Sequence, residues 1–105
     1  MRREIFLYAL FFGHLAVEKI LKAFYVSKKK DQAPYSHNLL SLAELAEITL
    51  SDEKKEKLIK ITAFNLESRY PDEKRSFRKK CTEEFTVGEM KQIEEIFAWL
   101  KSMLQ

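Results

Sequence analysis

The sequence predicts an all-α protein, an antiparallel bundle of about four helices that forms one domain over residues 1–105. Three observations predict this fold class. Glycine and proline occur only twice each, which leaves few tight turns for a β-sheet. Charged residues make up 33% of the chain and are mostly Lys and Glu, which both favour helices. Apolar residues, 46% of the chain, recur at the three- and four-residue spacing of amphipathic helices.

The first predicted helix runs from about Arg3 to Ser27. Its first half, Ile5 to Leu15, is apolar nearly all round, which is typical of a helix that is buried on several sides. Gly13 costs a helix about 1 kcal/mol relative to alanine, so a close approach to another helix is the expected reason for it. We expect this helix to be central, or to pack against a second subunit as well as its own chain.

The middle of the chain predicts two shorter helices after a polar connection. Ser36 is the expected N-cap of a helix from about His37 to Glu47. Ser51 is the expected N-cap of a third helix, which runs to about Ser68. Pro71 prevents that helix from continuing, because the residue before a proline is pushed out of the α region.

The C-terminal part predicts an irregular stretch and then the last helix. Residues 69–84 form the least regular segment, with a short helical turn near Asp72 to Lys79. Thr86 and Glu89 have the spacing of a capping box, in which a hydroxyl and a carboxylate each accept from an unpaired backbone N–H. We expect the last helix to follow this box and to carry its apolar side from Met90 to Leu104.

Composition excludes several classes of protein. A net charge of +3 is too small for a nucleic-acid-binding arm. The single Cys81 has no intramolecular disulfide partner, which favours a reducing, cytoplasmic setting. Cys and His are too few for a usual four-ligand zinc site, and we expect no cofactor. Glu18, Lys19 and Lys22 interrupt the first apolar run, so we expect no membrane span.

Arg69, Tyr70 and Asp72 are the first group of candidate ligand-binding residues. An arginine can hold a phosphate with two hydrogen bonds, and a tyrosine can stack on a base. The alternative is a structural role, in which Arg69 pairs with a carboxylate and Asp72 caps the following turn.

His37, Glu18 and Lys22 form the second group of candidates. His37 lies at a predicted helix start, where it either contacts a ligand or makes a structural hydrogen bond. Glu18 and Lys22 are four residues apart and either form a helical ion pair or line a polar groove with Arg69. His14 lies within the apolar run, so we expect it to be buried in the core or at a subunit seam.

A basic cluster spans residues 74–80. It contains Lys74, Arg75, Arg78, Lys79 and Lys80 around Phe77. Basic and aromatic side chains together suit nucleic acid, whereas three nearby glutamates weaken the positive field and favour an ordinary solvated face.

Three blocks of sequence carry a family resemblance. They are residues 8–23 (YALFFGHLAVEKILKA), residues 34–39 (PYSHNL) and residues 64–72 (FNLESRYPD). Together with Trp99-Leu-Lys101, they resemble the HEPN family of small prokaryotic helical proteins, which are often encoded beside minimal nucleotidyltransferases. The blocks are similar to the long central helix of the family, to its Pro-x-x-His-Asn/Asp-Leu motif and to its Arg-Tyr-Pro-Asp signature.

The sequence departs from the family pattern in two respects. Family members usually carry another helix before the one around Tyr8, so the resemblance implies a bundle that lacks the usual first helix. Ribonuclease members use an arginine followed, after four to six residues, by a histidine. His14 and His37 have no arginine at that distance upstream, so the resemblance carries over no catalytic residue.

Three classes of function remain open. The resemblance favours a non-catalytic binding and interaction module, a homodimer that partners a nucleotidyltransferase and binds a nucleotide or an RNA phosphate near Arg69. The alternatives are a toxin-like, metal-independent ribonuclease with an atypical Arg69 and His37 arrangement, and a purely structural helical oligomer. We expect the dimer interface to include residues 5–15. We also expect Arg69, Tyr70 and Asp72 to approach His37 or the Glu18–Lys22 face.

Overall fold

The computed structural model describes residues 2–65 and 70–104, and these residues form five helices and no strand. The helices are α1 (Arg2–Lys29), α2 (Leu39–Leu45), α3 (Asp52–Thr62), α4 (Pro71–Lys80) and α5 (Glu83–Met103). The predicted all-α bundle is confirmed, with a complete helix α4 where only a short turn was expected. Within the described part of the chain, no helix has the length and apolar character that crossing a membrane requires.

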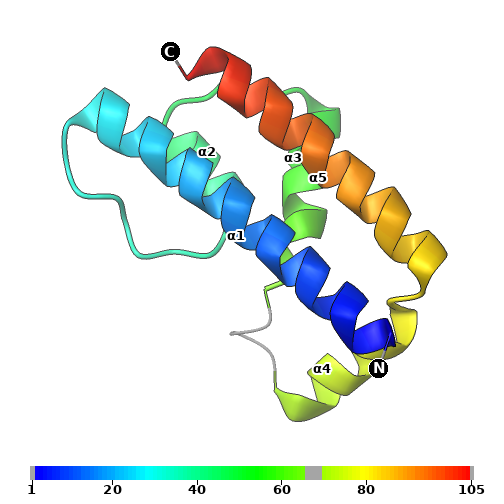
Figure 1. Ribbon diagram of the computed structural model, residues 1–105. Coiled ribbons are helices and arrows are strands. Elements are labelled where there is room, and N and C mark those ends of the chain that lie inside the picture. Colours follow the sequence, from blue (N-terminus) through cyan, green and yellow to red (C-terminus); the bar gives the residue numbers. More distant parts are fainter. Residues whose placement is uncertain (1, 66–69, 105) are drawn as a thin grey trace.

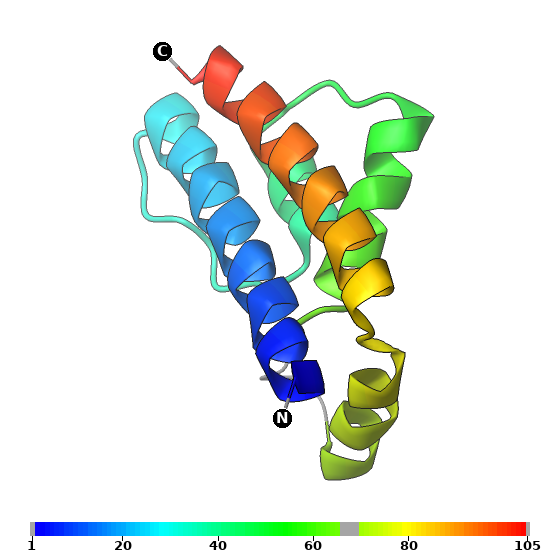
Figure 2. The same ribbon diagram turned by 45° about the vertical axis from the view of Figure 1, so that its right-hand side comes forward.

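The helices are arranged around α1, which packs against each of the other four. α1 and α5 lie side by side and run in the same direction, whereas α3 runs the opposite way (Figures 1 and 2). α2 packs between α1 and α3, and α4 covers the end of the bundle at which α1 begins (Figure 2). The direction of the helices is therefore mixed, because α1 and α5 are parallel neighbours.

The buried side of α1 supplies much of the core. It contributes five apolar side chains that are less than a tenth exposed: Leu7, Leu10, Val17, Ile20 and Leu21. Gly13 marks the closest approach to α5, as expected, since a Cβ at this position would lie 2.8 Å from the Ile93 Cδ1 atom. The all-round apolar character of this helix therefore reflects neighbours on several sides.

The predicted limits of α2 and α3 need correction. Asn38, and not Ser36, caps α2, because its side chain accepts from the Ser41 backbone N–H at 3.0 Å. Ser51 caps α3 as predicted. However, α3 ends at Thr62, six residues before the predicted Ser68. The backbone N–H groups of residues 63–65 bond three residues back, which tightens the chain, and Phe64 then turns into the core.

The start of α5 was also predicted wrongly. Thr82 is its N-cap and accepts from the Phe85 backbone N–H at 3.1 Å, so the cap lies four residues before the predicted Thr86. Thr86 is buried within the helix and does not form the expected capping box with Glu89. Thr82 and Thr86 both precede helical sequence. Packing of the first turn decides which of the two caps the helix.

α4 forms although nine of its ten residues are polar or proline. Pro71 occupies its first turn, where the missing N–H costs nothing, and acidic and basic residues lie at the ends that suit the helix dipole. Phe77 is its one buried residue and stacks on Phe64, with ring centroids 5.4 Å apart. Cys81 follows as a buried packing residue, as predicted. Phe77 is therefore the apolar anchor of this charged helix on the bundle.

We predict that the Leu21→Ala variant loses about 2–5 kcal/mol of free energy of unfolding, because Leu21 is fully buried and the substitution leaves a cavity. Chemical denaturation followed by circular dichroism measures this loss. Leu45→Ala is the control, since the Leu45 side chain is 48% exposed, and we expect it to change stability much less. Equal losses in the two variants would contradict the described core.

Candidate functional site

A buried carboxylate lies at the centre of the second group of candidate residues. Glu18, in the middle of α1, is only 3% exposed. Its Oε2 atom accepts a hydrogen bond from Lys22 Nζ at 3.0 Å, one turn further along the helix. Its Oε1 atom accepts from His37 Nδ1 at 2.9 Å, so the side chain joins α1 to the segment before α2. The structure thus brings together Glu18, Lys22 and His37, and the predicted ion pair is present.

His14 completes this polar cluster from the buried side. It is fully buried, as predicted, and its Nε2 atom donates to the His37 backbone oxygen at 3.1 Å. Its Nδ1 atom lies 3.8 Å from Glu18 Oε1. The exposed Tyr35 ring meets the His37 ring edge-on at 5.4 Å, and Lys22 Nζ lies 6.0 Å from the centre of the Tyr35 ring. Spacing along the chain does not predict that Tyr35 and His14 join the other three residues.

The segment before α2 is positioned by hydrogen bonds at successive residues. His37 is held through both its ring and its backbone oxygen. The Asn38 backbone N–H bonds to Ser36 Oγ at 3.1 Å. The Leu39 N–H donates to Thr62 Oγ1 at 3.1 Å, which ties the start of α2 to the end of α3. These contacts fix the returning chain against α1 and place the His37 ring beside Glu18.

Of the first group of candidates, the structure describes Tyr70 and Asp72, and these two lie apart from the cluster. Arg69 lies outside the described residues. Tyr70 is the N-cap residue of α4, makes no side-chain capping bond and is 77% exposed. Asp72 is exposed in the first turn of α4, where its charge suits the helix dipole. Within the described part of the chain, no hydrogen bond or ion pair links Tyr70 or Asp72 to the polar cluster.

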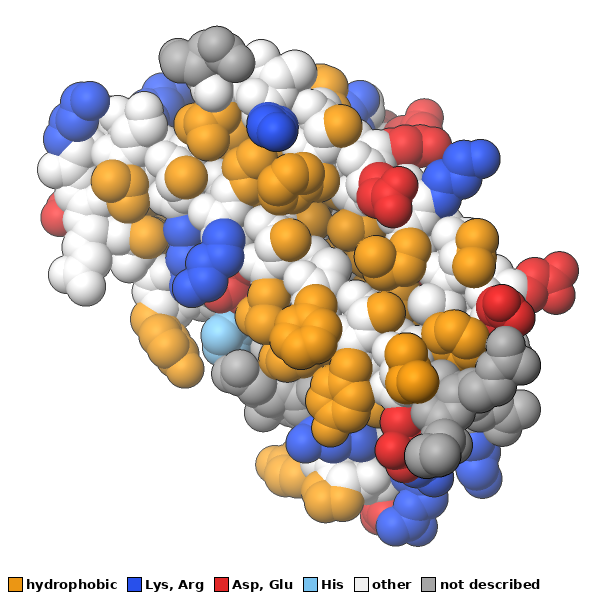
Figure 3. All heavy atoms as spheres, viewed as in Figure 1, with side chains coloured by type: hydrophobic (Ala, Val, Ile, Leu, Met, Phe, Trp, Pro, Cys, Tyr) orange, Lys and Arg blue, Asp and Glu red, His pale blue; other side chains and the backbone are white. Residues whose placement is uncertain are grey.

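A second feature is an apolar surface over α1 and α5, which Figure 3 shows as a spread of hydrophobic side chains. Ile5, Tyr8 and Phe12 of α1 are 67%, 51% and 62% exposed. Beside them lies an open groove of about 490 Å³. Its lining residues are Ala9, Phe12, Gly13, Ala16, Met90, Ile93, Glu94 and Phe97. The predicted interface half of α1 therefore carries exposed apolar side chains next to an apolar hollow.

Comparison with protein families matches residues 1–103 to the HEPN domain. The chain belongs to the HEPN domain family. The resemblance carried by the three sequence blocks is therefore confirmed, and it extends over nearly the whole chain. Comparison with curated proteins and with solved structures gave no match.

In this HEPN domain, the family-like blocks fall on the elements that build the polar cluster. Residues 8–23 lie within α1 and supply Glu18 and Lys22, and residues 34–39 supply His37 and the cap of α2. The Glu18 carboxylate can only accept, so His37 Nδ1 carries the proton in their hydrogen bond. A carboxylate that orients an imidazole can serve acid–base chemistry, and the same bond can serve to hold a loop. Among the described residues, no group of three His, Cys, Asp or Glu side chains is placed to bind a metal ion.

The environment of Glu18 shifts its ionisation. Burial by itself would raise the pKa of this carboxyl group, but the hydrogen bonds from His37 and Lys22 and their charges outweigh burial and lower the pKa below the ordinary value of 4.5. A carboxyl group with a lower pKa in the folded state binds protons less readily when folded than when unfolded. Its contribution to stability is therefore complete above pH 4.5 and is lost as the pH falls through the folded-state pKa.

We predict that Glu18→Gln lowers the free energy of unfolding by about 1–3 kcal/mol at neutral pH, because charge-assisted hydrogen bonds to His37 and Lys22 are weakened. The gap between variant and wild type should narrow as the pH falls from 4.5 through the lowered pKa of Glu18 in the folded state. Urea denaturation across this pH range measures the gap. Glu56→Gln on the exposed side of α3 is the control and should follow the wild type. A gap that is the same at every pH would contradict the assigned role of Glu18.

Proposed function

We propose that this HEPN domain is a non-catalytic binding and interaction module that works as a homodimer, partners a nucleotidyltransferase and binds a nucleotide or an RNA phosphate. One observation carries the proposal, namely the apolar surface on α1 and α5 with its groove of about 490 Å³. Large apolar patches on soluble domains mark sites of contact with other molecules. The family match supports the same class of function.

A second copy of the chain is the occupant that fits this surface. A two-fold interface needs one patch that is complementary to itself, with a projection beside a hollow. Phe12 projects from α1 and is 62% exposed, and the small residues Ala9 and Ala16 of the same helix line the adjacent hollow. Two copies related by a two-fold axis can each place Phe12 in the groove of the other. Glu94 is the one charged residue that lines the groove, so few charges need to be desolvated.

A nucleotidyltransferase is proposed as partner on the basis of the family, whose small prokaryotic members are often encoded beside such enzymes. The most direct test is to identify the neighbouring gene, produce its product with this chain and purify the two together. A stable complex with a neighbouring nucleotidyltransferase would support the proposal. A homodimer that binds neither this enzyme nor any nucleotide or RNA would instead support the purely structural oligomer.

We predict that Phe12→Glu weakens self-association by about 30-fold or more, because truncation of a central aromatic residue costs about 2 kcal/mol at an interface and the new charge is also buried. Sedimentation equilibrium at micromolar concentration measures the change. Ile59→Glu is the control, since Ile59 is 56% exposed on α3, outside the groove. We expect this control to remain dimeric. A monomeric wild type, or equal effects of both substitutions, would refute the proposed interface.

The ribonuclease alternative is motivated by one observation, the hydrogen bond between Glu18 and His37, which orients an imidazole. We predict that the purified chain does not cleave single-stranded or structured RNA without added metal. The family motif that pairs arginine and histidine is absent, and an acid–base group contributes about 10²–10⁴-fold to a rate. Cleavage by the wild type that disappears in His37→Ala would overturn this prediction. Equal cleavage by both proteins would show that His37 is not the acid–base group.

A further inference from the structure

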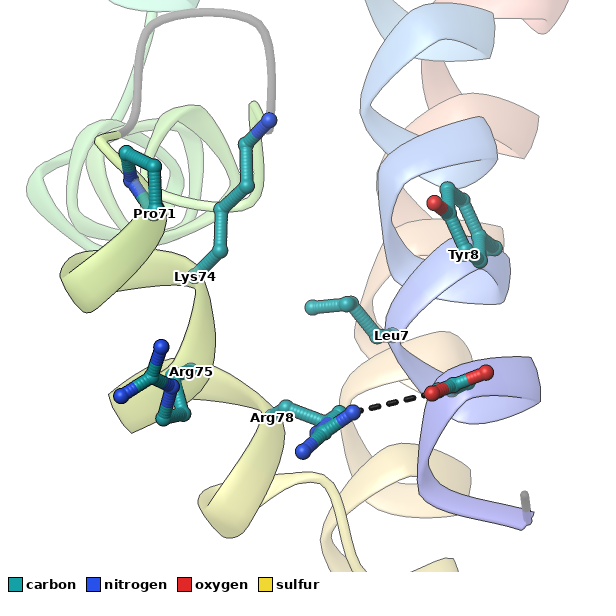
Figure 4. Close-up of a pocket in the computed structure, with 7 residues that line it drawn as sticks. Leu7, Tyr8, Pro71, Lys74, Arg75 and Arg78 are labelled. Atoms are coloured by element: carbon teal, nitrogen blue, oxygen red, sulfur yellow. Dashed lines mark hydrogen bonds and ion pairs between the residues drawn. The ribbon is translucent and has the colours of Figure 1, made fainter.

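A cleft lies between the first turns of α1 and the whole length of α4, on the edge of the bundle (Figure 4). Its volume is about 430 Å³, which lies within the range of small-molecule sites. The lining residues are Glu4, Leu7, Tyr8, Pro71, Lys74, Arg75 and Arg78. Three cationic side chains and one carboxylate therefore surround this cleft, and its charge balance is strongly positive.

The cations of the cleft fall into two kinds. Arg78 reaches across to α1, where its Nη1 atom donates to Glu4 Oε1 at 2.9 Å (Figure 4). Lys74 and Arg75 leave α4 in different directions and neither reaches α1, with Arg75 on the side of the helix away from α1 (Figure 4). Among the described residues, no carboxylate forms an ion pair with either of them. Both side chains are exposed and line the cleft, and both are long enough to turn toward an anion with more than one negative charge.

The α1 side of the cleft carries apolar and aromatic side chains beside Glu4. Leu7 is 6% exposed and forms part of the core, so it gives this wall a rigid base. Tyr8 is 51% exposed and offers a ring face and a hydroxyl group. Pro71, at the first turn of α4, adds a second apolar surface. The cleft thus combines a positive side with a side suited to the flat or apolar body of a ligand.

We propose that this cleft binds a small organic phosphate monoester, with the phosphate group on Lys74 and Arg75 and the organic body against Tyr8 and Leu7. This inference rests on the ligand-binding part of the proposed function and deepens it, since it places the ligand on residues that the candidate groups did not include. Arg78 acts as a positioning residue, because its ion pair with Glu4 joins the two walls.

The dimensions favour a small ligand over an RNA chain. Single-stranded RNA is bound along grooves that track several phosphates, with a series of basic and aromatic side chains. Here the positive side is limited to one helix of ten residues, and Asp72 and Glu73 lie exposed at its start. A phosphate monoester needs only one cationic pair and one wall. A nucleoside monophosphate and a sugar phosphate share this chemistry, and they differ in the body that meets Tyr8.

The test is calorimetric titration of the full chain with AMP, ribose 5-phosphate, inorganic phosphate and adenosine. We expect AMP to bind, and we expect the double variant Lys74→Glu, Arg75→Glu to weaken AMP binding by about tenfold or more, because charge-assisted contacts to the phosphate are lost. The matched control is Lys55→Glu, Lys91→Glu, which makes the same change in net charge at exposed positions on α3 and α5. The control should bind AMP nearly as well as the wild type.

Tyr8→Ala tests the apolar wall separately from the phosphate. We expect it to weaken AMP binding severalfold and to leave the binding of inorganic phosphate unchanged. If ribose 5-phosphate binds as tightly as AMP, the ligand class is sugar phosphates. If ribose 5-phosphate binds more weakly than AMP, the ligand class is nucleotides. Sedimentation equilibrium of every variant measures its oligomeric state, so that a loss of ligand binding can be distinguished from a loss of the dimer.

Three results would overturn the inference. If AMP binds and both double variants weaken it equally, the ligand lies elsewhere, while the proposed function stands. If none of the four compounds binds at millimolar concentration, both this site and the proposed nucleotide binding are refuted. The proposed dimer is tested separately by the Phe12→Glu variant. A short single-stranded RNA that binds tenfold tighter than AMP through Lys74 and Arg75 would replace the small ligand by RNA.

Discussion

The buried carboxylate of Glu18 is the constraint on which the arrangement of the first half of the protein depends. A charge that is removed from water is costly unless hydrogen-bonded partners compensate it. Lys22 supplies one partner within α1, but His37 comes from a segment 19 residues away, so compensation requires the chain to return along α1. That return fixes the start of α2, and α2 in turn provides the surface on which α3 packs.

The different sides of α1 make different contacts in the domain. One side is built into the core, one meets α5 at Gly13, and one carries the polar cluster around Glu18. At its start, Glu4 reaches α4 across the basic cleft. The apolar surface centred on Phe12 is left exposed. The apolar residues that make this helix look uniform in the sequence therefore have different partners, and the exposed side is the one on which we propose that a second copy packs.

The sequence was sufficient where local chemistry decides the structure and insufficient where tertiary contacts decide it. Ser51 and Gly13 were predicted correctly, because a cap and a missing side chain act locally or on one neighbour. Asn38 replaced Ser36 as a cap because the contacts of His37 with α1 determine which residue can turn into the helix. The pairing of Glu18 with His37 could not be read from spacing, since nothing in the sequence specifies that the intervening loop runs back along α1. α4 was underestimated because its apolar pattern consists of Phe77 alone.

The parallel packing of α1 on α5 has a consequence for how the chain folds. The first and the last helix share the most extensive contact in the domain, so the main pairing joins residues about 80 positions apart. Helical proteins usually fold quickly because their contacts are local, and a pairing between the two ends raises the contact order and slows folding. During synthesis, the side of α1 that α5 covers stays exposed until the last helix has left the ribosome. Between the synthesis of α1 and that of α5, the new chain therefore exposes an apolar helix side that chaperones or a second chain can contact first.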